Sequence, residues 1–394
     1  MIGFNKIKNY FRNINILWCN STSYNCIIYG CDSKYKKNVI DIVSSVSNFI
    51  FIEIGTYYIL FYRFLFIIPF FIKIILNRKD EKNLSFIFLA VRASLLYQTI
   101  HTYKPKIVLT YIDNDPVFQL IADFCSSIKF ITIQNGARGM YNIGNISHLK
   151  IINYFCFSKY DMNFLLRNGY KANRWIPVGN FLTSIFVENV VKKNNFSKEF
   201  DICLVSQWRN EFYEDYKNNK EFHSLRISID SVINTLDKFI KKYPKTKMCI
   251  TLFSNDEREY NLYKNVFDER CTIFKTNKFN IWTSYEAIIK SRTTVSINST
   301  MLIEALELKS LPLGYNPSGD PYNDATLPDI FLSRSEEELI GKLIYNLSKV
   351  EEEINEISER IPACEIVKNA INFAIEGSPQ LFEDYLDKFS VRIN

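Results

Sequence analysis

Polar side chains that directly follow short apolar runs are the residues of this sequence best placed for chemistry. The clearest case is the run 295–297, after which hydroxyl and amide side chains stand where a helix is expected to begin. Groups at a helix start bind anions, because unpaired backbone N–H groups and the helix dipole favour negative charge there. We expect this segment to bind the phosphate of an activated donor, through Ser296, Asn298, Ser299, Thr300 and Glu304. The alternative is an ordinary helix N-cap, in which Ser or Thr only satisfies a backbone N–H.

A carboxylate follows another apolar run, residues 107–111. We expect Asp113 to accept the proton of an incoming hydroxyl, which is the role of a general base in group transfer. Asn114 beside it is expected to contact the acceptor. The alternative is again an N-cap, since Asp115 precedes Pro116 and proline is favoured at the first position of a helix. The N-cap interpretation accounts for Asp115 but not for Asp113, which therefore remains a candidate for catalysis.

Two further polar clusters follow the runs 129–133 and 201–205. Glycines after the first run permit close approach of the backbone to a ligand, and arginine pairs well with phosphate or carboxylate groups. For the cluster after the run 201–205, the alternative is that its arginine is an ordinary surface residue at the end of a strand. We expect the first cluster to bind the acceptor and the second to bind the donor: Gln134, Asn135 and Arg138, and Ser206 and Arg209.

Several other chemistries lack their motifs in this chain. It contains no P-loop, no Gly-x-Gly-x-x-Gly after a strand, no Gly-x-Ser-x-Gly and no His-Glu-x-x-His. Its three histidines are scattered, and its nine cysteines form no Cys-x-x-Cys pair. A metal site or a disulfide framework is therefore not expected. We expect a reaction that needs neither a metal nor a cofactor.

The elements that must position these residues alternate along the chain. Short apolar runs alternate with helical patterns, which is typical of βαβ units and parallel sheets. We expect an α/β fold with two Rossmann-like, doubly wound domains, spanning 1–190 and 200–394, joined by the polar linker 191–199. A helical tail is expected from 335 to 371. Strands of the second domain are expected at 201–205, 248–253, 271–274, 294–297 and about 311–315. Because ligands bind beyond the carboxyl ends of parallel strands, the candidate residues are expected to face an interdomain cleft.

Residues 49–76 are almost entirely apolar and aromatic, with Glu53, Arg63 and Lys73 as interruptions. Three interpretations remain open: a buried core segment, a helix that docks on a membrane interface, and a transmembrane helix, for which the charges are costly. No secretory signal is apparent. We expect a cytoplasmic protein and leave open a peripheral attachment to the inner membrane at its cytoplasmic face. The net charge of +6 over 394 residues is too weak to predict nucleic-acid binding.

The motifs together resemble those of the bacterial surface carbohydrate biosynthesis proteins, a group of glycosyltransferases with two Rossmann-like domains, the GT-B type. The similarity covers about residues 85–330. Related capsule transferases often have Gln-His-Gly where this chain has Gln-Asn-Gly at 134–136. The blocks that carry the resemblance are Thr-Tyr-Ile-Asp-Asn at 110–114, Phe-Ile-Thr-Ile-Gln-Asn-Gly-Ala-Arg at 130–138, Ser-Gln-Trp-Arg at 206–209 and Ser-Ile-Asn-Ser-Thr at 296–300 with Glu-Ala-Leu at 304–306.

The resemblance implies that the protein transfers a sugar from a nucleotide-sugar donor to a cell-surface glycan or a lipid-linked acceptor. Donors of the UDP, GDP and CMP types all remain open. Asp113 is the expected general base if the reaction inverts the anomeric centre. Three alternatives stand beside this function: a nucleotide-sugar 2-epimerase, a polyol-phosphate transferase, and a non-catalytic scaffold of glycan assembly.

Overall fold

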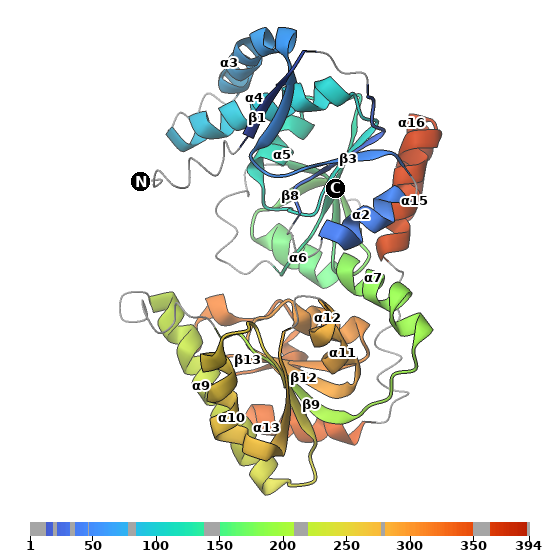
Figure 1. Ribbon diagram of the computed structural model, residues 1–394. Helices are drawn as coiled ribbons and strands as arrows, with labels where there is room; N and C mark the ends of the chain where they lie inside the picture. The colour runs from blue at the N-terminus through green and yellow to red at the C-terminus, as the bar shows by residue number, and fades with distance from the viewer. Residues whose placement is uncertain are drawn as a thin grey trace.

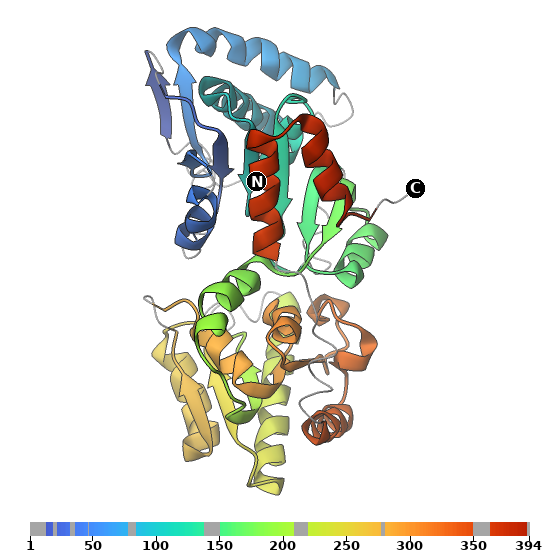
Figure 2. The ribbon, with the colours of Figure 1, turned by 90° about the vertical axis from the view of Figure 1, so that its right-hand side faces the viewer.

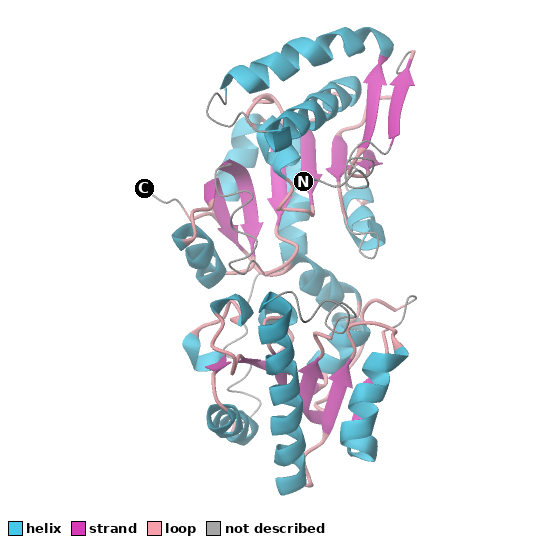
Figure 3. Ribbon diagram, turned by 90° about the vertical axis from the view of Figure 1, so that its left-hand side faces the viewer, coloured by secondary structure: helices cyan, strands magenta, loops and turns pink. Residues whose placement is uncertain are grey.

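Two six-stranded sheets, one in each half of the chain, form the framework of the protein (Figure 1). The computed structural model describes residues 13–18, 22–31, 36–45, 47–77, 84–137, 150–208, 220–276, 280–349 and 363–391. All strand pairings in both sheets are parallel. Helices flank the strands of each sheet (Figure 3). The predicted fold class, two doubly wound α/β domains with a helical tail, is therefore confirmed.

The first sheet has the strand order β3-β2-β5-β6-β7-β8. Its strands are β2 (Cys26–Tyr29), β3 (Phe49–Ile52), β5 (Ile107–Thr110), β6 (Lys129–Ile133), β7 (Lys150–Cys156) and β8 (Lys171–Pro177). The strands are connected by helices that include α2 (Lys36–Ser44), α4 (Leu84–Tyr103), α5 (Pro116–Ala122) and α6 (Lys159–Arg167), and α7 (Phe181–Asn189) follows the last strand. After β3 the chain returns to the other side of β2, so the strand order reverses between β2 and β5. In open parallel sheets, ligands bind outside the carboxyl ends of the strands at such a switch point.

The second sheet has the order β11-β10-β9-β12-β13-β14, which reverses between β9 and β12. Its strands are β9 (Phe200–Val205), β10 (Met248–Thr251), β11 (Cys271–Phe274), β12 (Ser291–Ser296), β13 (Leu311–Tyr315) and β14 (Leu332–Ser333). Its helices are α9 (Lys220–Lys242), α10 (Glu257–Phe267), α11 (Thr283–Ile289), α12 (Met301–Glu307) and α13 (Glu336–Ser348). The five predicted strands of this domain are present, with bounds shifted by at most a few residues.

Residues 49–76 form several short elements instead of one long helix. After β3 come β4 (Thr56–Leu60), the 3₁₀ helix η1 (Phe61–Phe66) and α3 (Ile67–Asn77). β4 pairs in parallel with β1 (Asn13–Leu17) in a separate two-stranded sheet. The buried part of the stretch, which agrees with the core interpretation, includes Ile52, Tyr57, Ile59, Phe70 and Ile74. Among the residues that the structure describes, no helix is long and apolar enough to cross a membrane.

The helical tail expected from residue 335 divides between the two domains, although we expected residues 200–394 to belong together. Its first helix, α13, packs on the second domain. The helices α15 (Ala363–Glu376) and α16 (Pro379–Asp387) lie beside the first sheet, and Figure 2 shows both against that domain. Arg174 of β8 bonds to both Glu383, at 2.6 Å, and Asp387, at 2.8 Å. The backbone N–H of Val391 donates to the carbonyl of Trp175 at 2.8 Å. The domain assignment of the tail is thus corrected: a helical pattern predicts an apolar face but not the sheet that will cover it.

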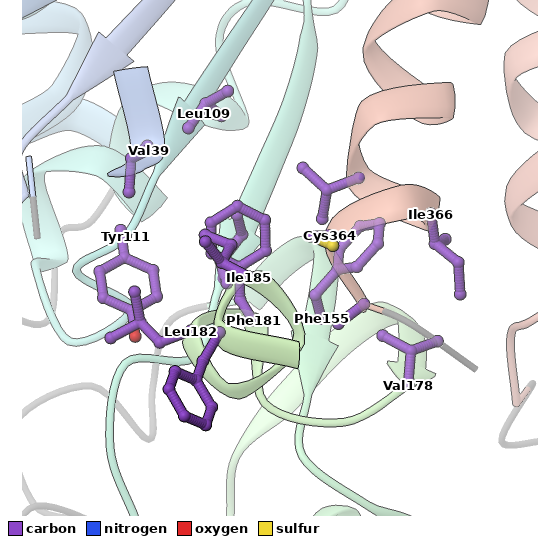
Figure 4. Packing of buried hydrophobic residues seen from close by; sticks show 14 of the residues in the cluster. Val39, Leu109, Tyr111, Phe155, Val178, Phe181, Leu182, Ile185, Cys364 and Ile366 are labelled. Carbon is purple, nitrogen blue, oxygen red and sulfur yellow. The ribbon is translucent and has the colours of Figure 1, made fainter. Parts of the chain in front are cut away.

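Helix α7 links the cores of the two domains. Phe181, Leu182 and Ile185 of this helix pack among buried side chains of the first sheet and of α15 (Figure 4). The ring of Phe186, in the same helix, lies 5.3 Å from that of Tyr285 in α11. The apolar core is therefore continuous from the first domain through α7 into the second.

Candidate functional site

The carboxyl ends of β6 and β12 meet where the two domains touch. The loop 134–137 follows β6, and the loop 297–300 follows β12. The backbone N–H of Ala137 donates a hydrogen bond to Thr300 Oγ1 across the domains, at 2.8 Å. We call the region of these two loops the domain seam. It contains the predicted acceptor segment on one side and the predicted donor segment on the other.

The loop 297–300 is held by Gln207, which sequence reasoning did not select. Gln207 Oε1 accepts hydrogen bonds from the backbone N–H groups of Ile297, at 3.1 Å, and Asn298, at 2.9 Å. Its Nε2 donates to Asn298 Oδ1 at 2.5 Å. Gln207 follows β9, so these bonds span the β9–β12 switch point of the second sheet. The predicted donor segment therefore lies where ligands bind in parallel sheets, with its backbone fixed in place.

The two hydroxyls at the start of α12 have different roles. Ser299 and Thr300 are both half-buried. Ser299 Oγ accepts from the backbone N–H of Met301 at 3.3 Å, as a cap does, whereas Thr300 is bonded to the first domain instead. With only seven residues, α12 contributes little of the dipole that the sequence analysis invoked. Any anion held here must therefore bind to individual N–H, hydroxyl and amide donors.

A second contact across the domains involves the predicted residue Glu304. Its Oε1 accepts from Asn180 Nδ2 at 2.8 Å, and Glu307 Oε1 accepts from the backbone N–H of Asn180 at 2.8 Å. Gly179 precedes with φ +105°, and a Cβ there would approach Glu307 Oε1 to 3.2 Å. A residue without a side chain is needed at this position, because L-residues rarely adopt this φ and the carboxylate leaves little room. Glu304 thus ties α12 to the start of α7.

The predicted residues Ser206 and Ser296 are buried parts of the framework. Ser296 Oγ donates to the carbonyl of Val205 at 2.8 Å, which joins β12 to β9. Ser206 Oγ donates to Glu259 Oε1 at 2.5 Å and accepts from the hydroxyl of Tyr263 at 2.9 Å. Glu259 is fully buried and also accepts from Ser254 and from the backbone N–H of Phe253. In this structure neither serine hydroxyl is accessible to a ligand at the seam.

On the first domain, Asp113 is fully buried behind the loop 134–137. Its Oδ2 accepts from the hydroxyl of Tyr154 at 2.6 Å, and its Oδ1 accepts from the backbone N–H of Asn135 at 3.4 Å. These bonds connect the ends of β5, β6 and β7. A general base must come within hydrogen-bond reach of the substrate proton. The observed position suits a residue that shapes the loop better than one that takes a proton, and Asn114 beside it is exposed.

Asp115 caps helix α5, as the N-cap interpretation expects. Its side chain accepts from the backbone N–H of Val117 at 3.0 Å, and Pro116 stands at the first helical position. Arg92 lies 3.7 Å from the same carboxylate oxygen. Burial lowers the pKa of Arg92, but the negative charge of Asp115 together with interactions with Tyr29 and Tyr57 outweighs burial and leaves the pKa above its usual value.

Gln134 also shapes its own loop. It is buried, its Oε1 accepts from the backbone N–H of Phe157 at 3.1 Å, and its Nε2 donates to the carbonyl of Gly136 at 3.0 Å. The following residues Asn135, Gly136 and Ala137 are half-buried at the seam. The predicted arginines, Arg138 and Arg209, lie outside the described residues.

Among the described residues, the chemistry available at the seam is therefore that of amides and hydroxyls. Asp113, Glu304 and Glu307 each already accept hydrogen bonds from the protein. Within the described part of the chain, no group of three or more His, Cys, Asp or Glu side chains is suited to hold a metal ion. Donors of this kind stabilise charge that develops on a leaving oxygen, provided that they are fixed before the reaction.

Two hollows lie elsewhere, at the amino end of the first sheet. The larger, of about 470 Å³, is lined by Lys104, Lys106 and Lys129 and by residues of α15 and α16. The smaller, of about 280 Å³, lies beside it and includes Arg174 and Glu383. Parallel strands present their ligand sites at the opposite, carboxyl end. We therefore do not assign the site to these hollows.

Comparison with known proteins finds similarity in the fold. No protein-family model matches the chain, and no curated protein sequence matches it either. A proposed UDP-N-acetylglucosamine 2-epimerase from Listeria monocytogenes matches in structure with a TM-score of 0.54 and 12% identity, over 91% of this chain and 97% of that chain. The UDP-GlcNAc 2-epimerase of Neisseria meningitidis, bound to UDP-GlcNAc, gives a TM-score of 0.49 and 14% identity, over 95% of this chain and all of that chain. The two-domain fold that the family resemblance implied is confirmed by the Listeria structure, and at this identity the likeness concerns the fold alone.

Proposed function

We propose that this protein is an enzyme that binds a nucleotide sugar at the domain seam and acts on the bond between the sugar and the phosphate. The observation that carries the proposal is the position of the loop 297–300. This loop is fixed by Gln207 at the switch point of the second sheet and touches the first domain through Thr300. The nucleotide would lie along the carboxyl edge of the second sheet, as ligands do in doubly wound folds.

We propose glycosyl transfer as the reaction. Asn298, Ser299 and nearby backbone N–H groups would stabilise the leaving phosphate, and Arg209 would add positive charge. The acceptor would bind from the first domain, at Asn114, Asn135 and Arg138. The family resemblance supports this reaction, and so does the amide and hydroxyl character of the described seam residues.

Epimerisation at C2 of a nucleotide sugar is the second candidate. The fold similarity to the proposed 2-epimerase from Listeria monocytogenes favours it. Inversion of a C–H centre needs a group that removes the proton on one face and a group that delivers one on the other. Among the described residues at the seam, Asp113, Glu304 and Glu307 all accept hydrogen bonds within the protein, which makes them poor candidates for both tasks.

The first experiment is a thermal-shift screen against UDP, GDP, CDP and CMP. A ligand that binds only the folded protein, at about 100 times its dissociation constant, should raise the free energy of unfolding by about 2.7 kcal/mol. We expect one nucleotide to give a clear shift. A flat response to all four would contradict nucleotide binding and favour the non-catalytic scaffold.

The second experiment follows the sugar itself. The enzyme is incubated with labelled sugar nucleotides that carry the preferred nucleotide, UDP-GlcNAc among them, with and without a glycan acceptor. Glycosyl transfer predicts nucleotide release that depends on the acceptor and no change at C2. Appearance of the C2 epimer without an acceptor would establish the epimerase instead, and transfer of a phosphate-linked polyol from a CDP donor would establish the polyol-phosphate transferase.

A further inference from the structure

The outer end of the first domain exposes a row of large apolar side chains. Along η1 and α3, Leu65 (76% exposed), Ile68 (67%), Ile72 (48%) and Leu76 (57%) recur at three- and four-residue spacing, so they share one side of a helix. We call this side, together with Trp18 and Phe61, the apolar face. Figure 1 shows α3 at the end of the first domain that points away from the second domain. The segment has apolar side chains both on the side that faces the domain and on the side that faces outward.

The opposite side of α3 is ordinary core. Phe70 and Ile74 are buried, and the ring of Phe70 stacks on that of Tyr97 in α4 with 3.7 Å between centroids. This packing fixes the orientation of α3 on the domain. The exposed row is therefore not the result of a poorly placed helix. A contiguous apolar surface of this kind marks a site of interaction with a membrane or another protein.

The described helices and strands that form and support the apolar face carry charges of one sign. The elements β1, β4, η1, α3 and α4 contain no Asp or Glu. Arg63 and exposed Lys73 lie on η1 and α3 themselves. Burial lowers the pKa of His101 in α4, and the positive charges of Arg63 and Lys104 lower it further, which shows that cations gather at this end of the domain. The described elements thus combine apolar side chains with cations, which complements a bilayer that contains anionic lipids.

Aromatic side chains stand at the edge of the apolar face. Trp18, 79% exposed, stacks on Phe61 with 4.7 Å between ring centroids. Tryptophan is enriched at the boundary between water and hydrocarbon, because its ring is apolar and its N–H stays hydrated. With eleven residues, α3 is too short to cross a bilayer, which needs about 20 residues. A helix of this length and composition lies in the plane of the interface.

We infer that the apolar face docks this protein on the surface of an anionic lipid bilayer. The side chains of η1 and α3 enter the boundary between headgroups and acyl chains, while Arg63 and Lys73 contact lipid phosphates. This inference does not depend on the proposed function. The face is distant from the domain seam (Figure 1), so changes to it are expected to leave nucleotide binding intact.

Flotation of the full chain with vesicles tests the inference. Vesicles of phosphatidylcholine alone are compared with vesicles that also contain phosphatidylglycerol. We expect strong binding only to the second kind, weakened by high salt because the screening length shortens. The double variant Ile68→Ser, Ile72→Ser should bind at least about tenfold more weakly, since it removes two side chains that would enter the bilayer. The matched control Ile330→Ser, at a side chain 71% exposed on the second domain, should bind as the wild type does.

Several results would overturn membrane docking. The first is that the protein binds neither kind of vesicle. The second is that the wild type and the double variant bind equally well. A third is a dimer in solution that Ile68→Ser with Ile72→Ser dissociates, because the apolar face would then be an interface between two copies of the chain. Thermal unfolding and nucleotide affinity of the double variant serve as controls, and both should match the wild type.

Discussion

Asp113 and Tyr154 show how a polar residue at a strand end can hold the backbone instead of reacting. The carboxylate is fully buried, and the phenol donates to it at 2.6 Å. The same carboxylate accepts from the N–H of Asn135, so it sets the start of the loop that reaches Thr300. We regard Asp113 as a positioning residue for the seam.

Substitution at both ends of this hydrogen bond distinguishes the two roles. If Asp113 positions the loop, Asp113→Asn and Tyr154→Phe should each lower the free energy of unfolding by about 1.5–3 kcal/mol, the range for buried bonds to charged groups. Turnover of the nucleotide sugar should fall to a similar extent in both, with an unchanged pH profile. Tyr315→Phe, which removes another hydroxyl bond in the second domain, is the matched control.

A general base would behave differently. Asp113→Asn alone would then lower turnover by at least about 100-fold. Tyr154→Phe would keep most of the activity, and the acidic limb of the pH profile would disappear only in the aspartate variant. That pattern would restore the role that the sequence suggested for Asp113.

At this scale the sequence pointed to segments that lie at the seam, but not to the residues that organise them. Gln207 bonds to residues about 90 positions further along the chain, and Asn180 bonds to Glu304 and Glu307 more than 120 positions away. No local spacing links such partners. The one local signal for Gln207 is its amide side chain, which stands two residues after a buried strand.

At the scale of elements, the tail gives the first domain two more helices. Glu383 of α16 accepts from Lys129 and from Arg174, each at 2.6 Å, and so joins the tail to β6 and β8. Burial by itself raises the pKa of Glu383. The hydrogen bonds from the two cations outweigh burial, so the pKa lies below its usual value.

This pKa shift predicts that the ion pairs of Glu383 contribute less to stability at low pH. A carboxyl group whose pKa is lower in the folded state stabilises the protein above its unfolded pKa, and this stabilisation is lost as the pH falls through the folded pKa. Wild-type protein should therefore exceed Glu383→Gln in stability at neutral pH, by no more than about 1 kcal/mol because the group is partly exposed. The difference should begin to shrink below about pH 4.3, the usual pKa of a glutamate, and vanish only when the pH lies below the lowered folded pKa. Urea unfolding across this range measures it, and a difference independent of pH would exclude the ion pairs as its cause.

Elements of the second domain were predictable because its buried parallel strands are short apolar runs, such as Met248–Thr251, between well-separated helices. The sequence pattern did not predict the individual elements of the first hundred residues. Apolar side chains in this region occur in strands, in helices and on an exposed face alike. Phe49–Ile52 and Ile67–Asn77 have similar composition but form a strand and a helix. Tertiary contacts decide between them.

At the scale of the whole molecule, the contacts between the two domains that the described residues make include hydrogen bonds and apolar packing. Ala137 bonds to Thr300 at the seam, Asn180 bonds to the carboxylates of α12, and Phe186 of α7 packs on Tyr285. The carboxyl ends of the two sheets thus share a boundary, while the hollows lined by lysines lie at the amino end of the first sheet. The fold thereby offers two separate places where an anionic nucleotide could bind, and we propose that it binds at the seam.

Hydrogen–deuterium exchange, with and without the nucleotide that gives the largest thermal shift, tests this choice most directly. Binding at the seam predicts that exchange slows by at least about tenfold in peptides that cover 134–137, 206–208 and 297–304. Peptides that cover 104–106 and 374–382 should exchange as in the free protein. Protection confined to the latter peptides, with the seam unchanged, would contradict the account.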